Sequence, residues 1–188
     1  MAKIITTFQE VIAEGEAARA ERSQTDGWWR AREGVLHTLC KTVKFMAPAE
    51  DGRRKVYAGP RFPVAELLPI LLRDLEPSLS PFLRGRALDC ASICAQAMEG
   101  AAPQVSGQDP RVTFFQVAAE AIGSQGGFPL RIGACKALKK FCALADEGTM
   151  RQVASYLVGG LCAFVPQVSA ETLHLVLDTF ISILRSAS

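Results

Sequence analysis

The chain has 188 residues, of which 49% are hydrophobic and only 7% aromatic. This length and apolar content suffice for one domain with a sizeable core and exclude extensive disorder. The net charge of +2 gives no global electrostatic reason to expect nucleic acid or a membrane surface as the partner. Because the apolar residues are mainly Ala, Leu, Val and Ile, closely packed helices are favoured over strands.

Apolar residues recur at helical spacing along the whole chain. The pattern is clearest from Val64, Met150 and Leu173, where apolar residues follow at offsets 3, 4, 7, 8 and 11 and so form one stripe on a helix. No long segment alternates with a period of two, so no sheet is predicted. In chain order the stripes cover residues 4–12, 28–43, 64–75, 83–98, 114–122, 130–142, 150–161 and 173–184.

The breaks between stripes divide these helices into pairs. Ser80-Pro81 and Asp109-Pro110 are typical of an N-cap followed by proline at the first helical position. Gly148 is expected to precede the seventh helix, and residues 47–61 and 101–107 are predicted to be loops. Short connections make neighbouring helices antiparallel. We therefore predict one domain over 1–188, with helix pairs at about 3–45, 63–98, 110–144 and 149–186.

The second helices of the pairs begin alike, which indicates an internal repeat. Their sequences are WRAREGVLHTL (29–39), LRGRALDCASI (83–93), LRIGACKALKK (130–140) and LHLVLDTFISI (173–183). The first residues lie 54, 47 and 43 positions apart, and two of these spacings are at or near the HEAT and armadillo period. The predicted fold is all-α: an α-α superhelix, or HEAT/armadillo-like solenoid, of about four antiparallel pairs. Such stacks expose long surfaces that bind macromolecules and rarely enclose a catalytic pocket.

Four segments also carry a family resemblance. DGWWRAREGVLHTL (26–39) resembles the Trp-Trp-Arg helix in the middle of importin-β-type nuclear transport receptors. The segments that follow it there are similar, in the same order, to LRDLEPSLSPFLRGRALDCAS (72–92), FPLRIGACKALKKFC (128–142) and ETLHLVLDTFISIL (171–184). The resemblance covers about residues 26–184 and is closest to the importin nine subfamily. It implies a HEAT-class segment of a nuclear import receptor that binds protein cargo, with core histones and the GTPase Ran as partners.

The resemblance also bounds what this segment does. Receptors of this family are much longer, and the repeats that bind Ran-GTP precede the block that the chain matches. The segment has a pI of about 8.3 and no acidic run, so it offers little electrostatic steering toward basic cargo. The alternative function is a HEAT-repeat scaffold subunit of a larger assembly. A central block exposes apolar stripes on its end helices, so we expect it to pack against further repeats or to self-associate.

Cysteine and histidine residues indicate core packing rather than chemistry. We expect five of the six cysteines to lie on buried stripes and Cys90 to lie off them. No CxxC pair occurs and only two histidines exist, so neither a metal site nor a cofactor is predicted. His37 and Cys40 are neighbours on one helix, but no orienting group or oxyanion site accompanies them, and we expect no enzyme. Reduced core cysteines, with no predicted membrane span or secretory signal, indicate the cytoplasm and nucleus.

Several residues are candidates for binding a partner. Trp28 and Trp29 either form a hot spot for a partner or wedge between neighbouring pairs. Arg30, Arg84 and Arg131 occupy equivalent repeat positions and are expected to bond carbonyls and carboxylates in the turns, although they could also line a binding ridge. A basic loop cluster is either solvated or contacts an acidic partner; it consists of Arg53, Arg54, Lys55 and Arg61.

Overall fold

The computed structural model describes residues 2–20, 27–46, 64–95, 109–123 and 126–187, and within these ranges the chain is helical and contains no strand. The all-α prediction is therefore confirmed. No helix of the described ranges is long and apolar enough to cross a membrane. In chain order the elements are α1 (Ala2–Ala20), α2 (Trp28–Met46), α3 (Val64–Arg73), α4 (Pro81–Cys94), α5 (Pro110–Gly123), α6 (Phe128–Phe141), the 3-10 turn η2 (Cys142–Leu144), α7 (Glu147–Phe164), η3 (Val165–Gln167) and α8 (Ala170–Ser186).

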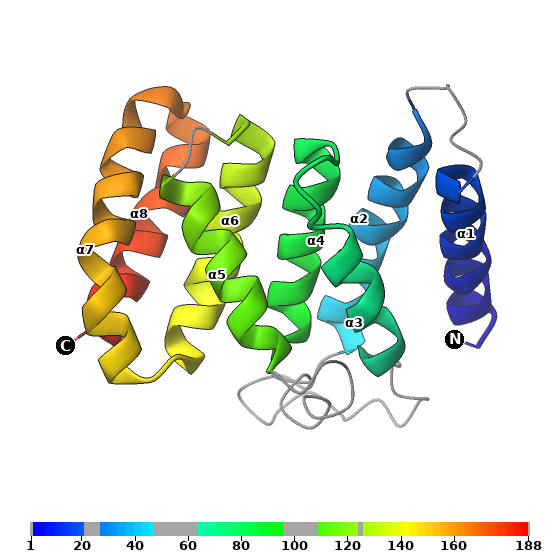
Figure 1. Ribbon diagram of the computed structural model, residues 1–188, viewed down its shortest axis with the longest axis horizontal. Coiled ribbons are helices and arrows are strands. Elements are labelled where there is room, and N and C mark those ends of the chain that lie inside the picture. The colour runs from blue at the N-terminus through cyan, green and yellow to red at the C-terminus, as the bar shows by residue number, and fades with distance from the viewer. Residues whose placement is uncertain (1, 21–26, 47–63, 96–108, 124–125, 188) are drawn as a thin grey trace.

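The helices pack in two layers. One layer consists of α2, α4, α6 and α8, each in contact with the next. The helices α1, α3, α5 and α7 each pack against the helix that follows them in the chain. Figure 1 shows the pairs side by side along the long axis of the molecule, with the N-terminus at one end and the C-terminus at the other. The order and pairing of the described helices therefore agree with the sequence-based prediction.

The predicted N-caps are present, but the start of α7 was placed wrongly. Ser80 Oγ accepts a hydrogen bond from the Phe82 backbone N–H at 3.3 Å, and Asp109 Oδ1 accepts one from the Arg111 N–H at 2.9 Å. α7 begins at Glu147, before Gly148, because Asp146 is its N-cap and accepts a bond from the Thr149 N–H at 2.8 Å. A capping carboxylate thus outweighs a glycine as the start signal.

The burial of one cysteine differs from the prediction. Cys162 on α7 lies at the surface, whereas Cys90, although it lies off the main stripe, is a core residue that is only 1% exposed. α4 packs against α2, α3, α5 and α6, so it is buried on nearly every side and a single apolar stripe does not describe it. α7 lies at the C-terminal end of the stack, where fewer helices cover it.

Two glycines bring α4 and α6 into backbone contact. A Cβ atom on Gly133 would lie 2.2 Å from the Gly85 carbonyl oxygen, and one on Gly85 would lie 2.4 Å from the Pro129 carbonyl oxygen. Real Cβ atoms do not come this close, so only glycine allows the two helices to approach to this distance. This contact fixes the spacing at the centre of the layer.

A buried ion pair joins the first two helix pairs. The Arg32 side chain is fully buried, and its Nε donates to Asp74 Oδ2, which is also fully buried, at 2.7 Å. Arg32 NH1 also bonds Glu16 of α1, whose second carboxylate oxygen lies 2.7 Å from Arg73 NH1. One guanidinium therefore ties α2 both to α1 and to the turn after α3.

Two of the three repeat-equivalent arginines bond carbonyls, as predicted. Arg84 Nε donates to Leu75 O at 3.1 Å. Arg131 NH2 donates to Ile122 O at 3.2 Å and to Gly160 O at 3.1 Å, which joins α6 to α5 and α7. The prediction is wrong for Arg30, which is exposed and lies over the Trp29 ring, 5.5 Å from its centroid. In the first pair Arg32, two positions further along α2, bonds the carboxylates of Glu16 and Asp74.

Replacing Gly133 with alanine tests the backbone contact between α4 and α6. The new methyl group would force the helices apart, and overpacking of this kind typically costs about 1–3 kcal/mol of unfolding free energy. Gly159→Ala is the control, because a Cβ there meets nothing within 4 Å and alanine favours a helix. Urea denaturation should show a lower free energy of unfolding for Gly133→Ala and no decrease for Gly159→Ala. Equal stabilities of the two variants would show that Gly133 is not needed for the approach of α4 and α6.

Replacing Asp74 with alanine tests the buried ion pair. The Arg32 guanidinium would stay buried with one carboxylate fewer, and breaking a buried pair in this way costs about 3–5 kcal/mol. The control is Asp178→Ala, which removes an exposed pair with Lys139, and it should change the urea midpoint little. If the two variants had similar urea midpoints, the buried ion pair would not stabilise the contact between the first two helix pairs.

Candidate protein-binding groove

A hollow lies over the contact between α4 and α6. Its volume is about 240 Å³, and it opens to solvent on the face formed by α2, α4 and α6. Gly85 and Gly133, which form the backbone contact, are among the residues that line it. The hollow is lined by Glu33, Phe82, Gly85, Arg86, Asp89, Phe128, Pro129, Ile132, Gly133 and Lys136. We call it the α4–α6 groove.

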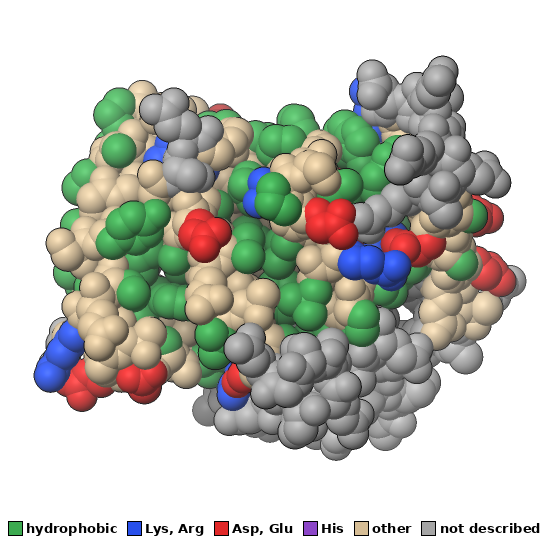
Figure 2. Space-filling view, viewed as in Figure 1, with side chains coloured by type: hydrophobic (Ala, Val, Ile, Leu, Met, Phe, Trp, Pro, Cys, Tyr) green, Lys and Arg blue, Asp and Glu red, His purple; other side chains and the backbone are tan. Residues whose placement is uncertain are grey.

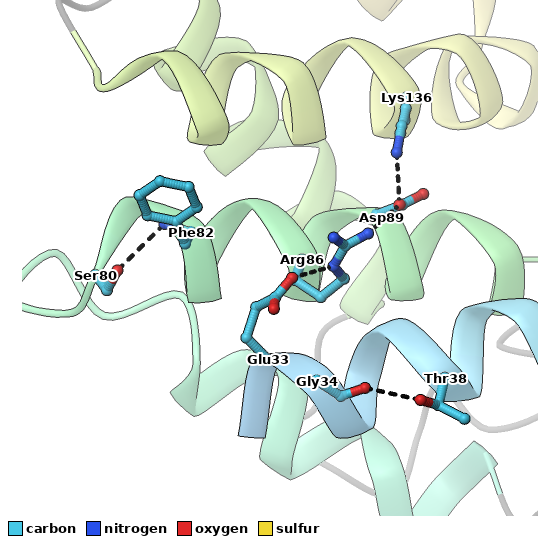
Figure 3. Close-up of polar contacts among 8 residues, drawn as sticks. All are labelled: Glu33, Gly34, Thr38, Ser80, Phe82, Arg86, Asp89 and Lys136. Atoms are coloured by element: carbon cyan, nitrogen blue, oxygen red, sulfur yellow. Dashed lines mark hydrogen bonds and ion pairs between the residues drawn. The ribbon is translucent and has the colours of Figure 1, made fainter. Parts of the chain in front are cut away.

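A chain of ion pairs runs along one end of this groove. Arg86 Nε donates to Glu33 Oε1 at 2.7 Å, and Arg86 NH1 donates to Asp89 Oδ2 at 3.2 Å. Lys136 Nζ donates to the same Asp89 oxygen at 2.7 Å. Figure 3 shows that these residues come from α2, α4 and α6 and point toward one another. Two cations and two carboxylates balance, so this end is polar without a net charge.

Aromatic rings border the other end. Phe82 is 55% exposed and Phe128 is 44% exposed, although both side chains are large and apolar. Phe82 stacks on Trp29 with ring centroids 5.7 Å apart, and Phe128 packs against Phe164 at 5.6 Å. Each exposed ring is therefore held in place on one side and open to solvent on the other. Aromatic residues, Phe among them, are enriched in the cores of protein interfaces.

The structure places some of the predicted partner-binding residues. Trp28 and Trp29 are half-buried and pack against the core. Trp29 bridges α2 and α4 by stacking on Phe82. This position agrees with one of the two hypotheses for the tryptophans, a wedge between neighbouring helix pairs. Trp29 does not line the groove but supports a ring that does. The basic cluster of Arg53, Arg54, Lys55 and Arg61 lies outside the described residues.

The groove residues were not identified from the sequence, although a signal for them existed. Gly85 and Gly133 interrupt two helices, and a glycine inside a helix often marks a close backbone approach. Phe82 and Phe128 each lie next to a proline at the start of a helix, Pro81 and Pro129 respectively. The charged residues of the groove lacked such a signal, since they look like ordinary surface residues.

His37 and Cys40, which are neighbours on α2, differ in burial. His37 is exposed and Cys40 is 3% exposed, so the two side chains lie in different environments. Among the described residues, no group of three or more His, Cys, Asp or Glu side chains could hold a metal ion. The groove itself combines apolar rings with paired charges, and this arrangement suits binding.

The opposite layer of the molecule has a different character. Figure 2 shows the side on which α3, α5 and α7 lie, where apolar and neutral atoms dominate and the few visible Lys, Arg, Asp and Glu side chains are scattered. Charges of one sign do not gather over the described part of this face. It therefore resembles ordinary protein surface more than an electrostatic docking site.

Buried thiols make stability depend on pH at the alkaline end. Burial raises the pKa of Cys135 and that of Cys142 from 9.0 to about 12. The unfolded chain loses these protons at lower pH than the folded chain. The contribution of the two thiols to the free energy of unfolding is therefore complete below about pH 9. It is lost as the pH rises toward 12, by at most about 1.4 kcal/mol per pH unit for each thiol.

Urea midpoints measured between about pH 8 and pH 11 test this dependence. Replacing Cys135 and Cys142 with alanine should flatten the alkaline fall relative to wild type, because the titrating thiols are gone. Cys162→Ala is the matched control, since this cysteine is exposed. The slope of the control should equal that of wild type, and an unchanged slope in the double variant would contradict the assignment.

No protein-family model matches the chain, and no solved structure matches it. The groove and the sequence motifs are therefore the basis for assigning a function.

Proposed function

We propose that the chain is a HEAT-type solenoid segment of an importin-β-type nuclear transport receptor and that it binds protein cargo. The observation that carries the proposal is the position of the four resembling segments. Three of them begin within two residues of the first residues of α2, α6 and α8, and the fourth, at 72–92, runs from α3 into α4. The helices α2, α4, α6 and α8 are successive members of one layer. Segments that are similar in sequence thus lie at equivalent places in space, as stacked repeats require.

The α4–α6 groove supports the binding role. A hollow of about 240 Å³ is suited to one or two side chains of a protein partner rather than to a whole cofactor. Fixed aromatic rings at one end provide apolar contact area at low entropic cost, and the paired charges at the other end offer hydrogen-bonding groups. We propose that cargo inserts an apolar side chain between Phe82 and Phe128.

The charge of the groove limits which cargo it selects. Glu33 and Asp89 are already paired with Arg86 and Lys136, so the groove has no free acidic surface for a basic tract. Histones and Ran, the partners that the resemblance implies, would therefore depend on surfaces beyond this groove. The groove itself is proposed to recognise shape and apolar character.

A pull-down from nuclear extract, with and without added Ran-GTP, tests this function. We expect the immobilised chain to retain proteins that mass spectrometry identifies as nuclear import cargo. Replacing Phe82 and Phe128 with serine should reduce their capture about tenfold or more, since interface anchors commonly contribute at least 2 kcal/mol each. Val112→Ser is the control, because Val112 is 50% exposed on α5, outside the groove. Both variants should keep the helical circular dichroism of wild type.

The outcomes separate the possible functions. Capture of cargo that the serine variant loses supports the receptor and the groove together. Capture that both variants retain would contradict the groove. Retention of a fixed set of assembly subunits, unaffected by the groove variant and by Ran-GTP, would favour the scaffold function instead.

A further inference from the structure

The last helix exposes a row of large aliphatic side chains. Leu177 is 48% exposed, Ile181 is 47% exposed and Leu184 is 57% exposed. Their spacing of four and then three residues places them on one face of α8. We call this row the α8 stripe. Single exposed aliphatic residues are common, but a row along a helix face is typical of an interface.

The repeat register shows that this face is covered in the preceding helices. The positions 43 residues earlier, on α6, are Ala134, Leu138 and Phe141, with exposed fractions of 0%, 0% and 2%. The positions a further 47 residues earlier, on α4, are Ala87, Ala91 and Cys94, with exposed fractions of 0%, 0% and 2%.

The difference follows from the neighbours of each helix. α4 and α6 each have a helix of the same layer on both sides, whereas α8 contacts α6 on one side and has no further member of the layer among the described helices on the other. The α8 stripe is thus the continuation of a surface that buries helices throughout the stack. An apolar helix is the element that fits it.

The stripe is complementary to itself. If two α8 helices pack antiparallel about a point between residues 180 and 181, Leu177 of one copy lies opposite Leu184 of the other. Ile181 then lies opposite the half-buried Phe180. A two-fold interface pairs one patch with itself in this way. Every position of the stripe therefore meets an apolar residue of the second copy.

The acidic residue beside the stripe does not oppose this pairing. Asp178, which borders the stripe, is already bonded to Lys139 at 2.6 Å. The whole chain carries a formal charge of only +2, and a protein with so little net charge has weak electrostatic repulsion between copies.

We propose that the α8 stripe is an interface through which two copies of the chain associate, α8 against α8 in antiparallel orientation. This interface lies on α8, at the C-terminal end of the stack, whereas the groove lies on α2, α4 and α6 (Figure 1). The two surfaces lie on different helices, so cargo binding and self-association can succeed or fail separately.

Light scattering over a range of concentrations tests the association. The measured mass should rise from 20.3 kDa toward twice that value with increasing wild-type concentration. Ile181→Glu should stay at 20.3 kDa over the same range, because an isolated charge would be buried in the interface. The matched control is Val112→Glu on α5, where a charge should leave association as in wild type. A monomeric wild type, or an Ile181→Glu variant that associates as before, would overturn the proposal.

A cross-link tests the orientation. In a Cys162→Ala background, which removes the one exposed cysteine of the described residues, Ile181→Cys places a thiol near the two-fold axis. Mild oxidation should give a disulfide-linked dimer with Ile181→Cys and little or none with Val112→Cys. Failure of Ile181→Cys to cross-link at a concentration where the protein is dimeric would rule out the antiparallel pairing of α8.

Discussion

The backbone contact between Gly85 and Gly133 is the constraint on which the centre of the structure depends. It lets α4 and α6 pack more closely than any pair with side chains at the crossing could. The α4–α6 groove lies over this crossing, and both glycines line it. The residues around it are brought close as well: Lys136 of α6 reaches Asp89 of α4 only because the two helices touch.

Buried polar groups give the apolar stack its register. Helices rich in Ala, Leu and Val can slide against each other at small cost, since many registers bury similar area. Arg131 is compatible with few of these registers. It donates to a carbonyl at the end of α5 and to another within α7, and its guanidinium lies 4.1 Å from the centre of the Phe164 ring. Arg32 imposes a similar restriction at the other end through Asp74. Both side chains act between pairs, where slippage would otherwise be easiest.

The sequence predicted the parts of this fold that local physics controls. Helix periods, the order of the pairs and the caps at Ser80 and Asp109 depend on residues close in the chain, and the structure confirms them. Which face of a helix is buried depends on how many neighbours it acquires. The prediction therefore failed for Cys162 on the open α7, and the stripe of α4 did not mark Cys90, which is buried because α4 packs against four other helices.

The candidate groove was harder to predict for the same reason. It is made by two glycines that are 48 positions apart and by rings from different helices, and a pattern read along one helix does not contain such pairs. The equivalence of Arg30, Arg84 and Arg131 predicted two sets of carbonyl bonds correctly. It misassigned the third, because Arg30 is exposed and lies over the ring of its chain neighbour Trp29.

The distribution of the cysteines has a consequence for measuring local opening. Cys40 on α2, Cys94 on α4 and Cys135 on α6 are each buried within a different helix pair, and Cys162 on the fourth is exposed. A buried thiol reacts with a labelling reagent only when its surroundings open, and helices in a stack can open separately. The native chain thus carries a reporter of local unfolding in three of its helix pairs. Cys162 provides an internal reference for the rate at which an unprotected thiol reacts.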